Sequence, residues 1–473
     1  MKRIIAFLMA FLVFAAQGAA ECACPDAEEH ARRQAIVDRV LAGYETMGAS
    51  VAVISHGQVV DTFVYGRANR ADNTPVTEET YFKIASVTKM ISALGVMRLV
   101  ENHTMELDAD ISDYLPYTVR NPYYPDTPIT LRQIMTHTAT LADGYHYKEA
   151  TDYGRITPLS IVFEGNYRKQ NFIAKQPGTV SDYSNFGGGM LGVFMEELSG
   201  MPVDEYMQTY IFQPLGVTAA YHTPNLPADA QIARIYNTET TGMTLDMMDS
   251  DETHWFAEPE LDYVHTAGGL MCTAEGLARL LICIIGDGTY NGARILRPET
   301  VEAMRTMQNN VGSVACDSNR GLNMNILTDE LVPGRTMYGH QGKAYGMIAA
   351  AYGDPTDQTG VVMITNGCNA STFNSVARIA RALLSAIYEG WLDEPQAYRL
   401  AQPAPTPELG PAPTAAPPLP SEPVPASTPA PTEEPLPEFE GDLIIRPADW
   451  LFEEDNSSEW TESETDELPA AVF

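Results

Sequence analysis

A proline-rich segment near the C-terminal end limits how much of this chain can fold. Residues from Gln402 to Pro437 are mainly Pro, Ala, Thr and Glu, and they include fourteen of the 33 prolines. This composition favours an extended polyproline-like spacer rather than a packed core. Residues 438–473 that follow carry too much charge for their apolar area and are predicted to be disordered. We therefore expect a folded body over residues 25–400, a linker over 401–437 and an acidic tail.

The N-terminal residues have the three-part layout of a secretory signal peptide. Two basic residues precede an apolar run from Ile4 to Ala16, and small residues follow up to Ala20. The run is shorter than the ~20 apolar residues that a membrane-spanning helix needs. We predict a signal peptide over residues 1–20, a secreted or extracytoplasmic protein, and no membrane span after cleavage. An uncleaved anchor and a lipoprotein, attached through Cys22 or Cys24, are the alternatives.

The charge balance excludes one class of partner. Acidic side chains outnumber basic ones by 62 to 29, which gives a formal net charge of −33. Such a chain repels phosphate backbones, and the sequence has no cluster of Lys and Arg, so nucleic acid is not expected as a partner. Much of the acidity lies in the tail, where the segment from Glu433 to Phe473 holds fourteen acidic residues and one basic residue. The tail is predicted either to solvate the protein or to dock onto an extracellular partner.

The six cysteines do not indicate a metal site. They stand at positions 22, 24, 272, 283, 316 and 368. Export would place them where disulfides persist, but the spacing leaves the pairing open. Cys272 and Cys283 are eleven residues apart on a predicted helix, about 16 Å along its axis, which is too far for a bridge to each other. The sequence has neither paired C-x-x-C motifs nor H-E-x-x-H, so neither a metal nor a cofactor is expected.

Apolar periodicity indicates an α+β fold. Strand patterns lie at both ends of the body, over residues 51–54, 59–65, 345–352 and 360–365. Helical patterns cover residues 26–44, 87–101, 131–137, 187–198, 203–212, 273–286 and 371–388. The simplest packing is a sheet built from N- and C-terminal segments, over about 25–125 and 330–395, with a mainly helical subdomain inserted over about 126–329. A site is expected in the cleft between the two parts.

Ser86-Val87-Thr88-Lys89 is the first motif that carries chemistry. It opens the predicted helix over 87–101, so Ser86 and Lys89 lie on one face and their side chains can meet. A serine hydroxyl becomes a strong nucleophile when a neighbouring group takes its proton, and a lysine can do so. An ordinary N-terminal serine cap with a solvated lysine is the competing interpretation of so short a motif.

Two later motifs favour the catalytic interpretation. Tyr183-Ser184-Asn185 stands in a glycine-rich segment, and His340-Gln341-Gly342 stands at the start of a C-terminal strand pattern. The three motifs, 97 and 157 residues apart, resemble the active-site motifs of the serine β-lactamase and penicillin-binding-protein superfamily. Four longer stretches resemble class C-like members: Glu79–Pro116, Ile129–Leu141, His265–Leu281 and Tyr338–Gly346. The resemblance covers roughly residues 35–388 and implies a β-lactamase/transpeptidase-like fold with an antiparallel sheet.

The resemblance also implies a role for each motif residue. Ser86 would form an acyl-enzyme, Lys89 would take its proton, and Tyr183 would pass a proton to the leaving group. Asn185 would bind a substrate carbonyl, and the backbone N–H groups of Ser86 and Lys343 would form the oxyanion hole. No metal or cofactor takes part in such a reaction.

The third motif departs from the lactamase pattern. His340 stands where that pattern has a lysine, and a histidine is charged only near or below about pH 6.5 unless its surroundings shift it. Gln341 replaces a threonine hydroxyl, so recognition of a substrate carboxylate is expected to be weaker. His340, Gln341 and Gly342 are predicted to contact substrate.

The expected function is that of an exported serine hydrolase acting on a small-molecule or peptide substrate of the cell-wall type. A D-alanyl-D-alanine carboxypeptidase or D-amino-acid peptidase is favoured. An esterase or weak β-lactamase of the same family is the alternative, and a non-catalytic penicillin-binding or sensor module is the alternative of another class.

Overall fold

The computed structural model describes residues 27–147, 157–163, 167–237, 245–246, 263–308 and 319–393. The predicted signal peptide, linker and acidic tail lie outside these residues, as do Cys22, Cys24 and Cys316.

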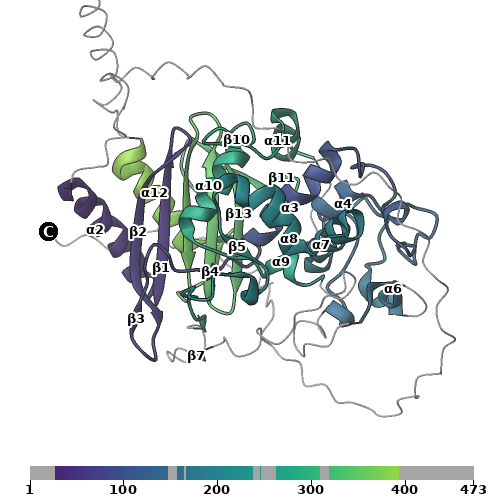
Figure 1. Cartoon of the computed structure of the whole chain (residues 1–473), viewed down its shortest axis with the longest axis horizontal. Coiled ribbons are helices and arrows are strands. Elements are labelled where there is room, and N and C mark those ends of the chain that lie inside the picture. Colours follow the sequence, from purple (N-terminus) through teal and green to yellow (C-terminus); the bar gives the residue numbers. More distant parts are fainter. Residues whose placement is uncertain are drawn as a thin grey trace, which may run out of the picture. The chain divides into compact units, whose positions relative to one another are not determined.

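One antiparallel sheet joins the two ends of the body (Figure 1). Its strand order is β11-β12-β13-β14-β15-β1-β2-β3. The strands are β1 (Gly48–Ser55), β2 (Gln58–Asn69), β3 (Thr74–Pro75), β11 (Arg320–Gly321), β12 (Met324–Thr328), β13 (Thr336–Ala344), β14 (Met347–Asp354) and β15 (Thr359–Thr365). The central pairing, β1 with β15, places Ala49 opposite Thr365, so the sheet requires both ends of the body. The predicted α+β class with a sheet from N- and C-terminal segments is correct.

Helices cover both faces of the sheet (Figure 1). On one face, α2 (Ala27–Gly43) and α12 (Arg378–Ile387) pack against alternate strand residues such as Val51, Val53 and Val361. On the other face, α10 (Ala274–Ile285) and α3 (Val87–Glu101) pack against Ala52, Ile54 and Val362. The burial of successive residues on opposite faces follows from the period of two in a strand. It explains why β1 and β15 are apolar almost throughout.

The helical region lies beyond α3. Its longer helix is α7 (Asn185–Ser199), and the shorter ones are α4 (Leu131–Met135), α6 (Leu159–Val162), α8 (Val203–Met207) and α9 (His265–Gly268). Helix α11 (Pro298–Arg305) instead contacts α10 and the strands β11 and β12. Single helical turns occur throughout the described body: η1 (Ile111–Tyr114), η2 (Tyr167–Asn171), η3 (Gln208–Phe212), η4 (Gln213–Leu215), η5 (Thr223–Asn225) and η8 (Tyr388–Leu392). Two-residue strands are β4 (Phe82–Lys83), β5 (Ala219–Ala220), β6 (Tyr236–Asn237), β7 (Leu245–Asp246), β8 (Met271–Cys272), β9 (Thr289–Tyr290), β10 (Ala293–Arg294), β16 (Thr372–Phe373) and β17 (Val376–Ala377).

Four sequence-based expectations differ from the structure. The sheet includes β11 and β12, within residues 320–328, which are expected to belong to the helical subdomain over about 126–329. The helix expected over 371–388 begins at Arg378, because β16 and β17 form a small hairpin first, with positive φ at Asn374 and Ser375. The third motif does not start a strand, since β13 begins at Thr336 and carries the motif in its second half. The helix expected over 203–212 changes from α-helical to π-helical winding after Met207.

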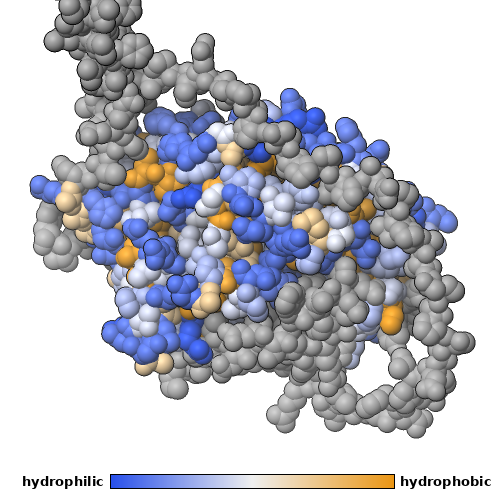
Figure 2. All heavy atoms as spheres, in the orientation of Figure 1, coloured by the Kyte–Doolittle hydropathy of each residue, from blue (hydrophilic) through white to orange (hydrophobic). Residues whose placement is uncertain are grey.

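The cysteines in the described part of the chain are buried thiols. Cys272 and Cys283 are free, in agreement with the expectation that they do not bridge each other. Cys272 lies on β8 rather than on the helix. None of the helices in the described ranges combines the length and the apolar composition that a membrane span requires. Figure 2 shows a largely hydrophilic face on which hydrophobic residues gather in small separate groups.

Candidate active site

Ser86 and Lys89 meet at the start of α3, as their spacing predicts. Ser86 is the residue that precedes the helix, and its hydroxyl does not cap a backbone N–H. Lys89 is fully buried, and its Nζ lies 3.1 Å from Ser86 Oγ. The same nitrogen donates to Asn185 Oδ1 at 2.6 Å and to the carbonyl of Ala267 at 2.7 Å. A solvated lysine is therefore excluded, because Lys89 has three oxygen partners inside the protein.

The second motif comes to this pair from the start of α7. Ser184 caps the helix by accepting the N–H of Gly187 at 3.0 Å, which places Asn185 in the first turn. Gly188 allows the close approach, because a Cβ there would come within 2.7 Å of Lys89 Cε. Lys89 Nζ lies 4.9 Å from the centre of the Tyr183 ring. Tyr183 Oη is buried and has no hydrogen-bond partner among the described residues.

His137 supports the second motif from behind. Its Nδ1 accepts the N–H of Ser184 at 3.2 Å, and its ring centre lies 4.3 Å from that of Tyr183. Burial and the nearby cations Arg320 and Lys89 hold the pKa of His137 well below its usual 6.5, so the ring is neutral. The residue shapes the loop that carries Tyr183, and among the described residues it makes no hydrogen bond to Ser86 or Lys89.

The third motif forms the opposite wall. Gly342 on β13 lies directly against the Ser86 turn, since a Cβ there would come within 2.5 Å of the carbonyl oxygen of Ile84 and 2.8 Å of Ser86 N. Ile348, opposite Lys343 on β14, donates its N–H to Thr365 Oγ1 at 2.9 Å, and its carbonyl accepts from the same hydroxyl at 3.1 Å, so both backbone groups face away from β13. Paired residues of an antiparallel ladder exchange both bonds or neither, so the N–H of Lys343 points away from β14, towards the other edge of β13. The geometry is compatible with an oxyanion hole made by the N–H groups of Ser86 and Lys343.

His340 is a neutral ring in this wall. Its Nδ1 donates to the carbonyl of Gln341 at 2.5 Å, because a carbonyl oxygen can only accept, and this leaves Nε2 as an acceptor. Burial, together with the charges of Arg320 and Lys89, lowers the pKa of His340 to about 3. His340 therefore does not replace the positive charge of a lysine at neutral pH.

Gln341 is the predicted site residue that the structure does not bring to the cluster. Strand alternation places its side chain on the face of the sheet opposite to His340 and Gly342. There Gln341 Nε2 donates to the carbonyl of Ser375, and Gln341 Oε1 accepts the N–H of Ala377 at 3.0 Å. The side chain ties β13 to the start of α12 instead of facing Ser86.

Comparisons with known proteins agree with this arrangement. The family model described as Beta-lactamase matches residues 33–386. The chain belongs to the beta-lactamase family. It is 31% identical to "Esterase EstB" of Burkholderia gladioli over 198 residues, 40% of this chain and 50% of the esterase. It is 28% identical to "D-alanyl-D-alanine-carboxypeptidase/endopeptidase AmpH" of Escherichia coli K12 over 195 residues, 40% of this chain and 48% of AmpH. The chain thus spans about half the length of these two relatives.

A solved structure shares the fold of this beta-lactamase family member. The octameric penicillin-binding protein homologue from Pyrococcus abyssi superposes with a TM-score of 0.60 at 23% identity, covering 76% of this chain and 77% of the homologue. At this identity the likeness establishes the β-lactamase/transpeptidase-like fold alone. The family and the named relatives together support the prediction that the chain is a serine hydrolase enzyme.

Two residues at the site were not predicted from the family motifs. Asp143 accepts hydrogen bonds from Asn185 Nδ2 and from the N–H of Phe186, both at 2.8 Å. Arg320 on β11 is 5% exposed, and its guanidinium carbon lies 5.6 Å from the centre of the Tyr183 ring. Both stand beside a glycine in sequence contexts typical of a turn, so the local pattern carries no signal for either.

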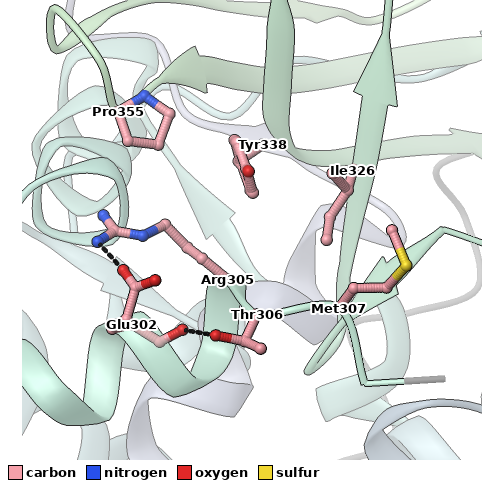
Figure 3. A pocket seen from close by; sticks show the side chains of 7 residues that line it. All are labelled: Glu302, Arg305, Thr306, Met307, Ile326, Tyr338 and Pro355. Atoms are coloured by element: carbon pink, nitrogen blue, oxygen red, sulfur yellow. Dashed lines mark hydrogen bonds and ion pairs between the residues drawn. The ribbon is translucent and has the colours of Figure 1, made fainter.

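A surface cavity of about 400 Å³ is separate from the cluster around Ser86 and Lys89 (Figure 3). Tyr338 and Ile326 line it from β13 and β12, and the paired Glu302 and Arg305 line it from α11. None of the motif residues lines it. The Ser86 cluster, rather than this cavity, is therefore the candidate for the site expected between the two parts of the body. Within the described ranges, no group of His, Cys, Asp or Glu is placed to hold a metal ion.

Proposed function

We propose that this chain hydrolyses acyl compounds through an acyl-enzyme on Ser86. The observation that carries the proposal is the fully buried Lys89 nitrogen 3.1 Å from Ser86 Oγ, beside the ring of Tyr183. To take the hydroxyl proton, Lys89 has to react as the neutral amine. Its two N–H groups then bond Asn185 Oδ1 and the Ala267 carbonyl, and its lone pair faces the Ser86 hydroxyl.

In the proposed acylation, Ser86 Oγ attacks the substrate carbonyl and Lys89 takes the hydroxyl proton. The N–H groups of Ser86 and Lys343 stabilise the negative charge on the carbonyl oxygen, a contribution worth about 10²–10³ in rate per donor in other acyl-transfer enzymes. Tyr183 then delivers a proton to the leaving nitrogen or oxygen as the bond to the acyl carbon breaks. Water hydrolyses the resulting Ser86 ester by the same groups in reverse.

We further propose a substrate that carries a free carboxylate, as in a D-alanyl-D-alanine carboxypeptidase or D-amino-acid peptidase. Arg320 supports this choice. It is buried and permanently charged, and its Nε and Nη1 atoms have no hydrogen-bond partner among the described residues. An unpaired buried cation is costly, so a substrate carboxylate that pairs with it would gain affinity. Arg320 would supply the positive charge that His340 lacks.

The proposed setting is outside the cytoplasm. Residues 1–20 have the layout of a cleaved signal peptide. The mass of the secreted protein tests this: a mature chain that begins at Glu21 supports export, and a chain that retains residues 1–20 contradicts it. An N-terminal lipid on Cys22 or Cys24 would identify a lipoprotein.

Intact-mass spectrometry and turnover assays test the reaction and the substrate class. The wild type and Ser86→Ala are exposed to a fluorescent penicillin, a p-nitrophenyl ester, an acyl-D-Ala-D-Ala peptide and the same peptide with a C-terminal amide. We expect a Ser86-dependent adduct and faster hydrolysis of the free-acid peptide by about 10- to 100-fold, the value of a charged hydrogen bond. Arg320→Gln should bring the two peptide rates together.

Other outcomes point to the alternatives. Fast ester turnover with neither peptide hydrolysed would indicate an esterase, and EstB is a relative with that name. Rapid penicillin hydrolysis would indicate a β-lactamase. A folded protein that forms no adduct on Ser86 would indicate a non-catalytic module and contradict the proposal.

A further inference from the structure

Asp143 lies next to the catalytic cluster without touching Ser86 or Lys89. It stands in the loop after α4, which ends at Met135, and it is partly buried. We propose that Asp143 is a positioning residue: it fixes the orientation of the Asn185 amide, and this amide in turn holds Lys89 Nζ in place for Ser86. The inference rests on the proposed acyl transfer through Ser86.

The carboxylate of Asp143 collects three donors from the start of α7. Its Oδ2 accepts from Asn185 Nδ2 at 2.8 Å. Its Oδ1 accepts from the N–H of Phe186 at 2.8 Å and from Ser184 Oγ at 3.2 Å. Each oxygen thus has its own set of partners, and the positive end of the α7 dipole favours a negative charge at this place.

A carboxylate can only accept, and this property determines which way the Asn185 amide faces. A side-chain amide has an acceptor at one end and a donor at the other. With Asp143 on one side, the Nδ2 end must face Asp143 and the Oδ1 end must face Lys89, where the distance is 2.6 Å. The reverse orientation would bring two acceptors together at Asp143 and two donors together at Lys89.

The orientation of Asn185 bears directly on the proton transfer. Lys89 Nζ has three oxygen partners, which are Ser86 Oγ, Asn185 Oδ1 and the Ala267 carbonyl. When the neutral amine donates to the last two, its lone pair faces Ser86 Oγ. Loss of the Asn185 acceptor would free the amine to turn, and a misplacement of about 1 Å at a reacting group costs about 10²-fold in rate.

Replacement of Asp143 by asparagine would disturb this orientation while keeping the size of the side chain. The new amide has a single acceptor end. Two donors on one side, Phe186 N–H and Ser184 Oγ, compete for this end with a single donor on the other side, Asn185 Nδ2. When the acceptor end faces Phe186 and Ser184, the donor end faces Asn185 Nδ2, so two donors meet. The Asn185 amide then turns over and presents Nδ2 to Lys89.

The test compares Asp143→Asn with the wild type and with Ser184→Ala in the full chain. The control variant removes the α7 cap and one bond to Asp143, but it leaves the Asp143–Asn185 bond in place. The measurements are the rate of Ser86 acylation by a p-nitrophenyl ester and by a penicillin, KM for the ester, and the thermal midpoint. We expect Asp143→Asn to lower the acylation rate and kcat by about 10²-fold with KM within about threefold.

Ser184→Ala is expected to lower the thermal midpoint by at least as much as Asp143→Asn, yet to keep acylation within about fivefold of the wild type. Wild-type acylation by Asp143→Asn would overturn the inference. Equal losses of acylation in the two variants would also overturn it, because they would mean that Asp143 acts only through the stability of α7. A wild type with no adduct on Ser86 would instead contradict the proposed function itself, and the positioning role with it.

Discussion

Gly342→Ala is expected to separate the oxyanion donors while leaving every side chain of the cluster intact. A Cβ at this position would lie 2.5 Å from Ile84 O, 2.8 Å from Ser86 N and 2.9 Å from Ala85 Cβ. All three belong to backbone or to a side chain with no freedom to move away. Ordinary contact begins at 3.4 Å, so β13 and the Ser86 turn would have to separate by about 0.9 Å.

This separation moves the N–H of Lys343 away from that of Ser86. A misplacement near 1 Å predicts a loss of about 10²-fold in kcat/KM, which is about 3 kcal/mol of transition-state stabilisation. Overpacking also costs about 1–3 kcal/mol of folding stability, so the thermal midpoint should fall by several degrees.

Pre-steady-state acylation with a p-nitrophenyl ester measures the effect, with Gly43→Ala as a control because a Cβ at Gly43 meets nothing within 4 Å. Binding should be less affected than acylation, because Ser86, Lys89, Tyr183 and Arg320 keep their side chains. Acylation by Gly342→Ala within threefold of the wild type would refute the view that β13 and the Ser86 turn are held in contact for catalysis.

Three further predictions follow from burial and geometry. Because the pKa of His340 is lowered to about 3 while an unfolded histidine titrates near 6.5, the unfolded chain binds more protons between these values, and the folded state loses stability as the pH is lowered. In urea unfolding, the free energy of unfolding should fall by about 2 kcal/mol from pH 7 to pH 5 because of His340. His340→Gln should remove this part of the pH dependence. Tyr183→Phe should slow peptide hydrolysis by 10²-fold or more but slow a p-nitrophenyl ester by less than tenfold, because nitrophenolate leaves without a proton; equal losses would contradict the role of Tyr183 as acid. Burial raises the pKa of the Cys272 thiol to about 12, so peptide mapping should find this residue labelled by a thiol reagent after unfolding and protected in the native protein.

Local sequence signals predicted the elements that depend on neighbouring residues. The helix over 87–101 has the predicted bounds, because apolar residues and good helix formers run without interruption after Ser86. The strands predicted over 51–54 and 59–65 also lie in β1 and β2, which pair with each other, and His56 and Gly57 between them adopt the positive φ that a tight turn needs. The start of α12 was not, because residues 371–377 have helical periodicity but pair as β16 and β17.

The site is a different case, because its chemistry depends on contacts between distant residues. The spacing of Ser86 and Lys89 can be read within one helical turn, and the family resemblance indicates Tyr183 and Asn185. Nothing near Asp143 or Arg320 in the sequence shows that the first meets Asn185 and the second meets Tyr183. The sequence also did not show where the Gln341 side chain lies, because one position along β13 decides which face of the sheet a side chain occupies.

The pairing of β1 with β15 also has a consequence for the order of folding. Ala49 and Thr365 are neighbours in the sheet although more than 300 residues separate them, so the N-terminal hairpin lacks its partner until nearly the whole body has been synthesised. Pairings of such long range form slowly, because the loop between them must close first. The chain is therefore expected to remain without its central sheet while it is being made. The Ser86 site would then be assembled only after the last strand has arrived.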